Sequence, residues 1–306
     1  MAGVRAGVMG AGVFGGYHAN KYAETDKADL VAVFDLDAER AGALAEKHGC
    51  AAFSDLDAFF DAVDAVTIAA PAKAHAALAR AALEAGKHAL VEKPIALSLE
   101  DADALVALAE ASGKVLQVGH QERYVFDAIG VLGRAEKPTR IESRRLGPYS
   151  ERGTDVSVVM DLMIHDLDMA RQLVEGDHHA VDAEETLKHG AHSDRTRAEL
   201  KFAGCDVVLE ASRIAEKRER DMRLVYPDGE IKIDFMNRAV ENTTSAELRE
   251  AFGADNAPLA LKDPLAFGTQ SFLESVVSGR APIVSGAAGR AALALALAIE
   301  AAAKAA

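Results

Sequence analysis

Cysteine is scarce in this chain of 306 residues: only Cys50 and Cys205 occur. Neither falls in a Cys-x-x-Cys or Cys/His spacing, so the sequence excludes a disulfide framework and offers no pattern for a metal site. We interpret both cysteines as core thiols. Their scarcity is typical of a protein from a reducing compartment, and we expect a cytoplasmic one.

Basic residues are outnumbered, with 34 Lys and Arg against 48 Asp and Glu and a formal net charge of −14. This balance excludes nucleic acid and an anionic membrane surface as the main partner. Long apolar runs are also lacking: the helical stretch at 291–306 carries Glu300 and Lys304, and we expect it to be too short and too charged to span a bilayer. The first strand pattern begins at Val4, which leaves no room for a signal peptide.

A strand–turn–helix–strand pattern opens the chain and organises its N-terminal part. The turn reads Gly10-Ala11-Gly12-Val13-Phe14-Gly15. In such a turn Gly10 permits the sharp bend, Gly12 lets backbone N–H groups approach a pyrophosphate, and Gly15 lets helix and strand lie close together. The pyrophosphate would sit on the N-terminus of the helix, where unpaired N–H groups point outward. The pattern therefore predicts a bound dinucleotide.

Asp35 ends the second apolar run, 30–34. A carboxylate in this place can accept hydrogen bonds from the adenosine ribose hydroxyls and repels a 2′-phosphate. No arginine follows it directly, and Arg40 is five residues further on. The sequence favours NAD over NADP. The alternative for the whole pattern is an ordinary glycine-rich turn.

Strand-like and helix-like segments alternate as far as residue 118. Strand patterns lie near 4–9, 30–34, 50–53, 65–69, 88–91 and 114–118. Helix patterns separate them, and Ser98 with Asp101 resembles a capping box at the start of the last helix. The alternation predicts a doubly wound parallel (Rossmann) sheet in an α/β dinucleotide-binding domain at 1–120.

The rhythm changes in 121–306. A strand pattern at 139–146 precedes a polar loop and a long helix pattern from about Asp155 to Val174. Further strand patterns then succeed one another at 181–187, 195–202, 206–212, 222–225 and 231–235, with hairpin signals between them. Successive strands imply a mainly antiparallel sheet, so we predict an α+β domain at the C-terminal end of the chain.

Lys93 lies where doubly wound sheets bind their ligands, at the carboxyl end of a strand. It follows the strand pattern 88–91 and precedes Pro94, which fixes the backbone after it. An ammonium group in this position can hold a substrate hydroxyl and favour its deprotonated form. The alternative is a surface lysine on a loop, and spacing alone leaves both open.

A narrow polar stripe marks the long helix pattern. At about 100° per residue, Asp161, His165, Asp168 and Gln172 fall on one side of an otherwise apolar helix. Asp161 and His165 can touch, and an acid beside an imidazole orients it as a general base requires. The alternative is the wet edge of an amphipathic helix. Asp166 lies on the apolar side and needs a partner there, a helix N-terminus or an arginine.

Taken together, the glycine turn at 10–15, Glu92-Lys93-Pro94 and Asp161-x-x-x-His165 resemble the glucose–fructose oxidoreductase/inositol dehydrogenase (Gfo/Idh/MocA) family. The resemblance covers nearly the whole chain, including the closing stretch from Asp263 to Pro282. It implies an NAD(P)-dependent dehydrogenase acting on a secondary alcohol of a sugar or cyclitol. It also implies a homodimer or homotetramer built on the exposed face of the second domain's sheet.

The resemblance assigns roles to individual residues. Lys93 would contact the reacting hydroxyl, His165 would take its proton while hydride moves to nicotinamide C4, and Asp161 would position substrate and histidine. The residues expected at the cofactor are Gly10, Gly12, Val13, Phe14, Gly15, Asp35, Ala70, Pro71, His75, Glu92, Lys93 and Gln121.

Two stretches depart from the family pattern. Where the family often has Asn and Arg after the sixth strand, this chain reads His120-Gln121-Glu122-Arg123-Tyr124, which bears on the cofactor contact expected from Gln121 and the substrate contact expected from Arg123. The sequence around Asp161 and His165, together with the lead at 155–160, is similar to the branch that includes bacterial enzymes oxidising the 3-hydroxyl of UDP-N-acetylglucosamine.

The polar loop at 144–152 agrees with a sugar-nucleotide substrate. Arg144 and Arg152 would meet a diphosphate, and Tyr149 would stack on a ring. The alternative for these arginines is a solvated strand edge.

The sequence thus predicts an NAD-dependent oxidoreductase that moves hydride between a secondary alcohol of a sugar or sugar nucleotide and nicotinamide, with 121–306 as the substrate-binding and oligomerisation domain. A free-sugar or inositol dehydrogenase is one alternative. A non-catalytic NAD-binding regulator on the same fold is another. The complete set of Lys93, Asp161 and His165 argues against the regulator, since a sensor has no need of a proton acceptor.

Overall fold

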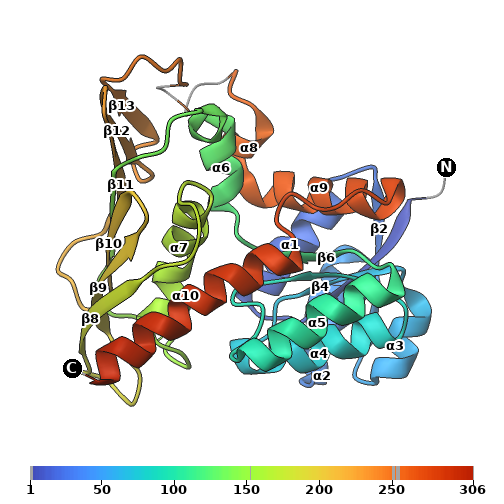
Figure 1. Cartoon of the computed structure of the whole chain (residues 1–306). Coiled ribbons are helices and arrows are strands. Elements are labelled where there is room, and N and C mark those ends of the chain that lie inside the picture. Colours follow the sequence, from blue (N-terminus) through green and yellow to red (C-terminus); the bar gives the residue numbers. More distant parts are fainter. Residues whose placement is uncertain (1–2, 152, 250–251, 253–255, 306) are drawn as a thin grey trace. The chain divides into compact units, whose positions relative to one another are not determined.

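The computed structural model describes residues 3–151, 153–249, 252 and 256–305 (Figure 1). The chain divides into two compact units. Unit 1 comprises Met1–Gln121 and Leu265–Arg290, and unit 2 comprises Glu122–Pro264 and Ala291–Ala306. Each unit therefore takes in a segment from the C-terminal end of the chain.

Unit 1 is built on a six-stranded parallel sheet in the order β3-β2-β1-β4-β5-β6. The strands are β1 Val4–Met9, β2 Ala28–Phe34, β3 Ala51–Phe53, β4 Ala65–Ile68, β5 His88–Val91 and β6 Leu116–Val118. The helices are α1 Val13–Ala23, α2 Ala38–His48, α3 Leu56–Ala62, α4 Ala72–Glu84, α5 Leu99–Ser112 and α9 Pro264–Ser278. The predicted Rossmann sheet is confirmed, and its order reverses between β1 and β4, where such sheets bind ligands.

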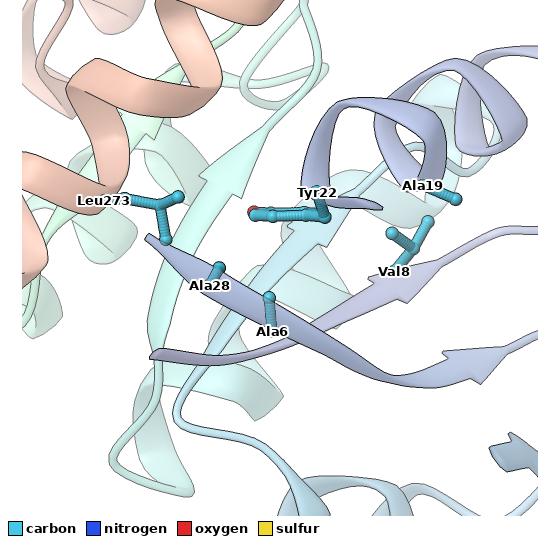
Figure 2. Close-up of a cluster of buried hydrophobic side chains, with 6 residues drawn as sticks. All are labelled: Ala6, Val8, Ala19, Tyr22, Ala28 and Leu273. Carbon is cyan, nitrogen blue, oxygen red and sulfur yellow. The ribbon is translucent and has the colours of Figure 1, made fainter. Parts of the chain in front are cut away.

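Alternation along β1 decides which helices cover each face of this sheet. Ala6 and Val8 pack with Tyr22 of α1 and Leu273 of α9, as Figure 2 shows. Gly7 points the other way, since a Cβ there would lie 2.6 Å from the Phe59 ring of α3. Helix α9, far from β1 in sequence, thus completes the core of unit 1.

Helix α10 spans Gly286–Ala305 and begins earlier than the stretch 291–306 recognised in the sequence. Gly286 and Gly289 open it because they lie against β6: a Cβ at either would come within 2.6 Å of Leu116 or Val118. The expectation that this helix is too short to span a membrane is wrong on length and composition. Of its most apolar 18-residue stretch, 44% is buried, and a helix in the core of a folded unit can have the same length and composition.

Unit 2 is built on a seven-stranded sheet in the order β13-β12-β11-β7-β10-β9-β8. Its strands are β7 Arg140–Leu146, β8 Ala180–Thr186, β9 Arg195–Phe202, β10 Cys205–Ser212, β11 Glu219–Tyr226, β12 Gly229–Asp234 and β13 Ala239–Asn242. Only the β7–β10 pair is parallel among the pairs described, so the prediction of a mainly antiparallel sheet is confirmed. The sequence patterns did not predict β13 or the short helix α6, Glu122–Ala128.

The long helix expected at 155–174 is not one regular α-helix. A π-helical segment, Val159–Met163, precedes α7, Ile164–Arg171, and Asp161 lies within it. Among the described residues, unit 2 also holds a 3₁₀ turn at Val131–Gly133, α8 at Leu259–Lys262 and the part of α10 that follows Arg290. Because π-helical turns occur frequently at functional sites, the irregular stretch around Asp161 is a candidate site.

The two faces of the unit 2 sheet differ in character. Ser143 and Arg145 on β7 are buried and bond to Asp166 of α7. Arg144 between them points to the opposite face, where it pairs with Glu219 and Asp221 of β11 at 3.0 Å each. On that opposite face, acidic and basic side chains from several strands alternate and form ion pairs.

We predict that Leu273→Ala destabilises the protein by about 2–5 kcal/mol, because Leu273 is fully buried between α1 and β2 and its removal leaves a cavity. Val277→Ala, on the same helix but 68% exposed, is the matched control and should change stability by less than about 0.5 kcal/mol. Urea denaturation measures both. Equal losses would mean that α9 does not contribute its Leu273 face to the core.

Candidate functional site

The glycine turn of unit 1 is closely packed at two of its glycines. Gly10 has φ of +101°, its N–H donates to the Phe34 carbonyl at 2.8 Å, and a Cβ on it would lie 2.7 Å from the Ala69 carbonyl oxygen after β4. A Cβ on Gly15 would lie 1.7 Å from the Gly10 carbonyl oxygen. Neither position accepts a side chain, so the start of α1 is held against the ends of β1 and β4.

Gly12 differs, because a Cβ there would meet nothing within 4 Å. It precedes α1 and provides no side-chain cap for the helix's first N–H groups. Val13 and Phe14 in the first turn are 54% and 41% exposed. Open space beside uncapped N–H groups fits a pyrophosphate, which would take these donors and the positive end of the helix.

Asp35 is fixed beside this turn. One carboxylate oxygen accepts from the Ala11 N–H at 2.7 Å, and the other accepts from the Asp37 N–H at 2.8 Å and from Arg40 at 3.1 Å. Burial raises the pKa of Asp35, but the two backbone donors and Arg40 outweigh it, so the pKa is lowered and the carboxylate stays ionised. An ionised carboxylate is the acceptor that ribose hydroxyls require, and the residues present fit NAD.

The chain after β4 and the chain after β5 are joined by His75. Its Nδ1 lies 2.7 Å from the Pro94 carbonyl oxygen, and its Nε2 lies 2.8 Å from the Ala70 carbonyl oxygen. Pro71 is the N-cap residue of α4, which carries His75. The buried imidazole therefore positions the two segments that the sequence predicts at the cofactor cleft.

Glu92, directly before Lys93, is 7% exposed and has a buried partner. His18 Nε2 of α1 lies 2.8 Å from its carboxylate, and Gln121 donates a longer bond of 3.4 Å. Burial raises the pKa of Glu92, but His18, Lys93 and His75 together lower it by more, so the net shift is downward and the carboxylate is anionic. The sequence did not predict His18 as the partner of Glu92. The one indication was its position on α1, the helix that follows the glycine turn.

In unit 2, His165 meets a carboxylate that the sequence did not indicate. Nδ1 of His165 lies 2.7 Å from Oε2 of Glu122, the first residue of α6. Asp161, the expected orienting acid, is half-buried in the π-helical segment, and a Cβ on Gly153 would lie 2.4 Å from its Oδ2. Gly153 is held in turn by Arg213, which donates to its carbonyl oxygen at 2.6 Å.

Two buried ion pairs join α7 to neighbouring elements of unit 2. Arg145 donates to both oxygens of Asp166 at 3.0 Å and to Oε1 of Glu122 at 2.9 Å. Arg123 of α6 donates to Asp168 of α7, with Nε 2.9 Å from the carboxylate. The prediction that Asp166 finds an arginine is confirmed.

The structure places the substrate-binding candidates in different settings. Arg123 is 5% exposed and pairs with Asp168, whereas Arg144 is on the sheet face opposite α7 and pairs with Asp221. Tyr149 is 42% exposed and stacks on His189 with ring centroids 3.9 Å apart. Arg152 lies outside the described residues. Arg144 is exposed to solvent, but on the face of a central strand, because β7 lies between β11 and β10.

The fold and the glycine turn define a dinucleotide-binding oxidoreductase, and comparison with known proteins specifies it. The model of the oxidoreductase family with an NAD-binding Rossmann fold matches residues 4–120, and that of the GFO/IDH/MocA C-terminal domain matches 133–232. The UDP-N-acetylglucosamine 3-dehydrogenase of Acidithiobacillus ferrooxidans is 37% identical, covering 99% of this chain and 98% of that protein. A solved structure of that enzyme superposes with a TM-score of 0.90 over 100% of this chain and 99% of its own, at 36% identity. The myo-inositol 2-dehydrogenase of Thermotoga maritima is 28% identical over 95% and 94% of the two chains.

The chain therefore belongs to the Gfo/Idh/MocA family of NAD-binding oxidoreductases. The resemblance, the fold class and NAD as the cofactor are all confirmed. Among the described residues, no group of three or more His, Cys, Asp or Glu side chains could hold a metal ion.

We predict that Gly12→Ala weakens NAD binding at least about tenfold without loss of stability, because its methyl group enters the space beside the uncapped N–H groups of α1. Gly42→Ala is the control: Gly42 lies within α2, its Cβ would also meet nothing, and alanine there should stabilise by about 0.5–1 kcal/mol. Calorimetric NAD titration and thermal melting test the pair. Unchanged affinity in Gly12→Ala would place the pyrophosphate elsewhere.

Proposed function

We propose that this protein oxidises a secondary hydroxyl of a sugar nucleotide with NAD, with the 3-hydroxyl of UDP-N-acetylglucosamine as the first candidate. The observation that carries the proposal is the 37% identity that extends over 99% of the chain to an enzyme named for that reaction. Both family models match parts of the same span, so the similarity is not confined to the cofactor-binding half.

The proposed catalytic set is Lys93, Asp161 and His165. Lys93 donates a hydrogen bond to the reacting hydroxyl and stabilises its oxygen as negative charge develops. Nε2 of His165 accepts the hydroxyl proton, and Asp161 orients the substrate. Bound NAD supplies the electron-pair acceptor: the carbinol C–H leaves as hydride, so ketone, NADH and one proton are the products.

Ionised neighbours support these roles. Glu92 stays anionic directly before Lys93, and the charge of Lys93 contributes to the lowered pKa of Glu92. In unit 2, the carboxylate at Nδ1 of His165 leaves Nε2 as the basic nitrogen. Tyr149, half-exposed on its stack with His189, is the proposed contact for a substrate ring.

An inositol or free-sugar dehydrogenase is the second candidate, supported by the 28% identity to a myo-inositol 2-dehydrogenase. Arg144 favours it as well, because its pairing with Glu219 and Asp221 leaves the diphosphate without the cation that the sequence predicted. Parallel assays with UDP-N-acetylglucosamine, myo-inositol and glucose, each with NAD and NADP, separate the candidates by the appearance of NADH or NADPH. Turnover of a free polyol alone would refute the sugar-nucleotide proposal.

We further propose that residues 1–120 bind the cofactor and 121–306 the substrate. The protein would be cytoplasmic, and a homodimer or homotetramer would form through the outward face of the unit 2 sheet. Arg144, Arg223 and Lys201 alternate there with acidic partners, so two copies can exchange ion pairs. Light scattering on the purified protein tests the assembly, and a monomer at micromolar concentration would refute it.

We predict that Lys93→Met lowers kcat by at least about 100-fold while NAD affinity changes less than about threefold, because the methionine removes the ammonium group but keeps much of the side-chain volume. Lys87→Met, in the loop before β5, is the control and should retain full activity. Initial rates of NADH formation and NAD titration measure the two effects. Full activity in Lys93→Met would exclude Lys93 from the catalytic set.

A further inference from the structure

Glu122 presents its carboxylate to Nδ1 of His165, and it comes from a different helix. Its Oε2 lies 2.7 Å from the ring nitrogen, and the two side chains are 19% and 14% exposed. Two atoms that both carried only lone pairs would repel at this distance. A carboxylate only accepts, so this close contact favours a proton on Nδ1 over a bare lone pair.

The carboxylate of Glu122 is itself held in place. Its other oxygen, Oε1, accepts from Arg145 at 2.9 Å, and Arg145 is locked by its two bonds to Asp166. Ser143 completes the chain of contacts by donating to Asp166 at 3.0 Å. Burial raises the pKa of Glu122, but His165 and Arg145 outweigh it and hold the pKa well below its usual range. Glu122 therefore stays an acceptor.

We infer that Glu122 is the positioning residue for His165: it fixes the imidazole as the Nδ1–H tautomer, so that Nε2 presents its lone pair to the substrate hydroxyl. The inference rests on the proposed function for its catalytic consequence. It adds Glu122 to Asp161, which the sequence predicts to position substrate and histidine. Chemically the arrangement is a carboxylate–imidazole pair, in which the acid sets the tautomer and does not itself take the proton.

Because Arg145 holds one oxygen of Glu122, the orientation of the amide in Glu122→Gln can be predicted. In Glu122→Gln, the amide oxygen must face Arg145, which only donates, so the amide NH₂ faces Nδ1 of His165. That nitrogen then has to accept, and the ring proton moves to Nε2, where it blocks proton uptake. We expect kcat to fall at least about 100-fold, with the KM for substrate and the Kd for NAD within about threefold of the wild type.

The dependence of kcat on pH gives a second readout. The charged groups facing the pair are Arg145 of β7 and Arg220 of β11, and Asp166 of α7 bonds to Arg145. None of these changes in Glu122→Gln, whereas one negative charge next to the base is lost. Residual activity should therefore extend to lower pH, because protonation of the base is less favourable without that charge.

Asp168→Asn is the matched control. It breaks the buried pair between Arg123 and Asp168, which joins the same two helices, α6 and α7, and it leaves the Glu122 carboxylate in place. We expect a lower melting temperature but an unchanged pH profile. If Asp168→Asn shifted the profile as Glu122→Gln does, the effect would be one of loosened packing, and the inference would be overturned.

A measurement on the wild-type protein covers the case in which Glu122→Gln does not fold. Nitrogen-15 NMR of labelled histidine, with the His165 signal identified among the ten histidines by its loss in His165→Gln, reports which ring nitrogen carries the proton. A proton on Nδ1 supports the inference, and a proton on Nε2 alone overturns it. If the wild type oxidised no sugar nucleotide or polyol, the proposed function would fail while this spectrum still decided the role of Glu122.

Discussion

The close backbone approach between Gly10 and Gly15 sets the position of everything that unit 1 presents to the cofactor. With no room for a side chain at either residue, α1 begins directly against the ends of β1 and β4. The same turn directs the Ala11 N–H to Asp35, and His18 further along α1 to Glu92. The turn and α1 thus contact the chain at the carboxyl ends of three strands, β2, β4 and β5, where such sheets bind their ligands.

Unit 2 positions its helices with buried charge. Arg145 and Asp166 join β7 to α7, and Arg123 and Asp168 join α6 to α7. Burying such pairs costs desolvation free energy that their attraction offsets only when all hydrogen bonds are made, so they are poor sources of stability. Their contribution here is orientation, because each guanidinium has a fixed, planar geometry that determines where the neighbouring carboxylate points.

The sequence predicted the parts of the fold that depend on local periodicity and on glycine. The strands of unit 1, the cap at Ser98 and the arginine partner of Asp166 could all be inferred from spacing and from the cost of burying a lone charge. The partner of His165 could not. Glu122 comes from another helix, and no local sequence pattern indicates it. Its only signal was the departure from the family's usual residues after the sixth strand.

The preference for NAD depends on the position of Asp35 at the end of β2 and also on the groups that hold its carboxylate. Two backbone N–H groups fix both carboxylate oxygens, so the charge cannot rotate away from a 2′-phosphate. Arg40 lies 3.1 Å from the same carboxylate and is 60% exposed, a cation that the sequence spacing had treated as distant. It also contacts Asp37 at 3.3 Å, so its charge is shared between two acids. The pocket edge therefore keeps a net negative charge, and repulsion of the additional phosphate outweighs the attraction of a single shared arginine.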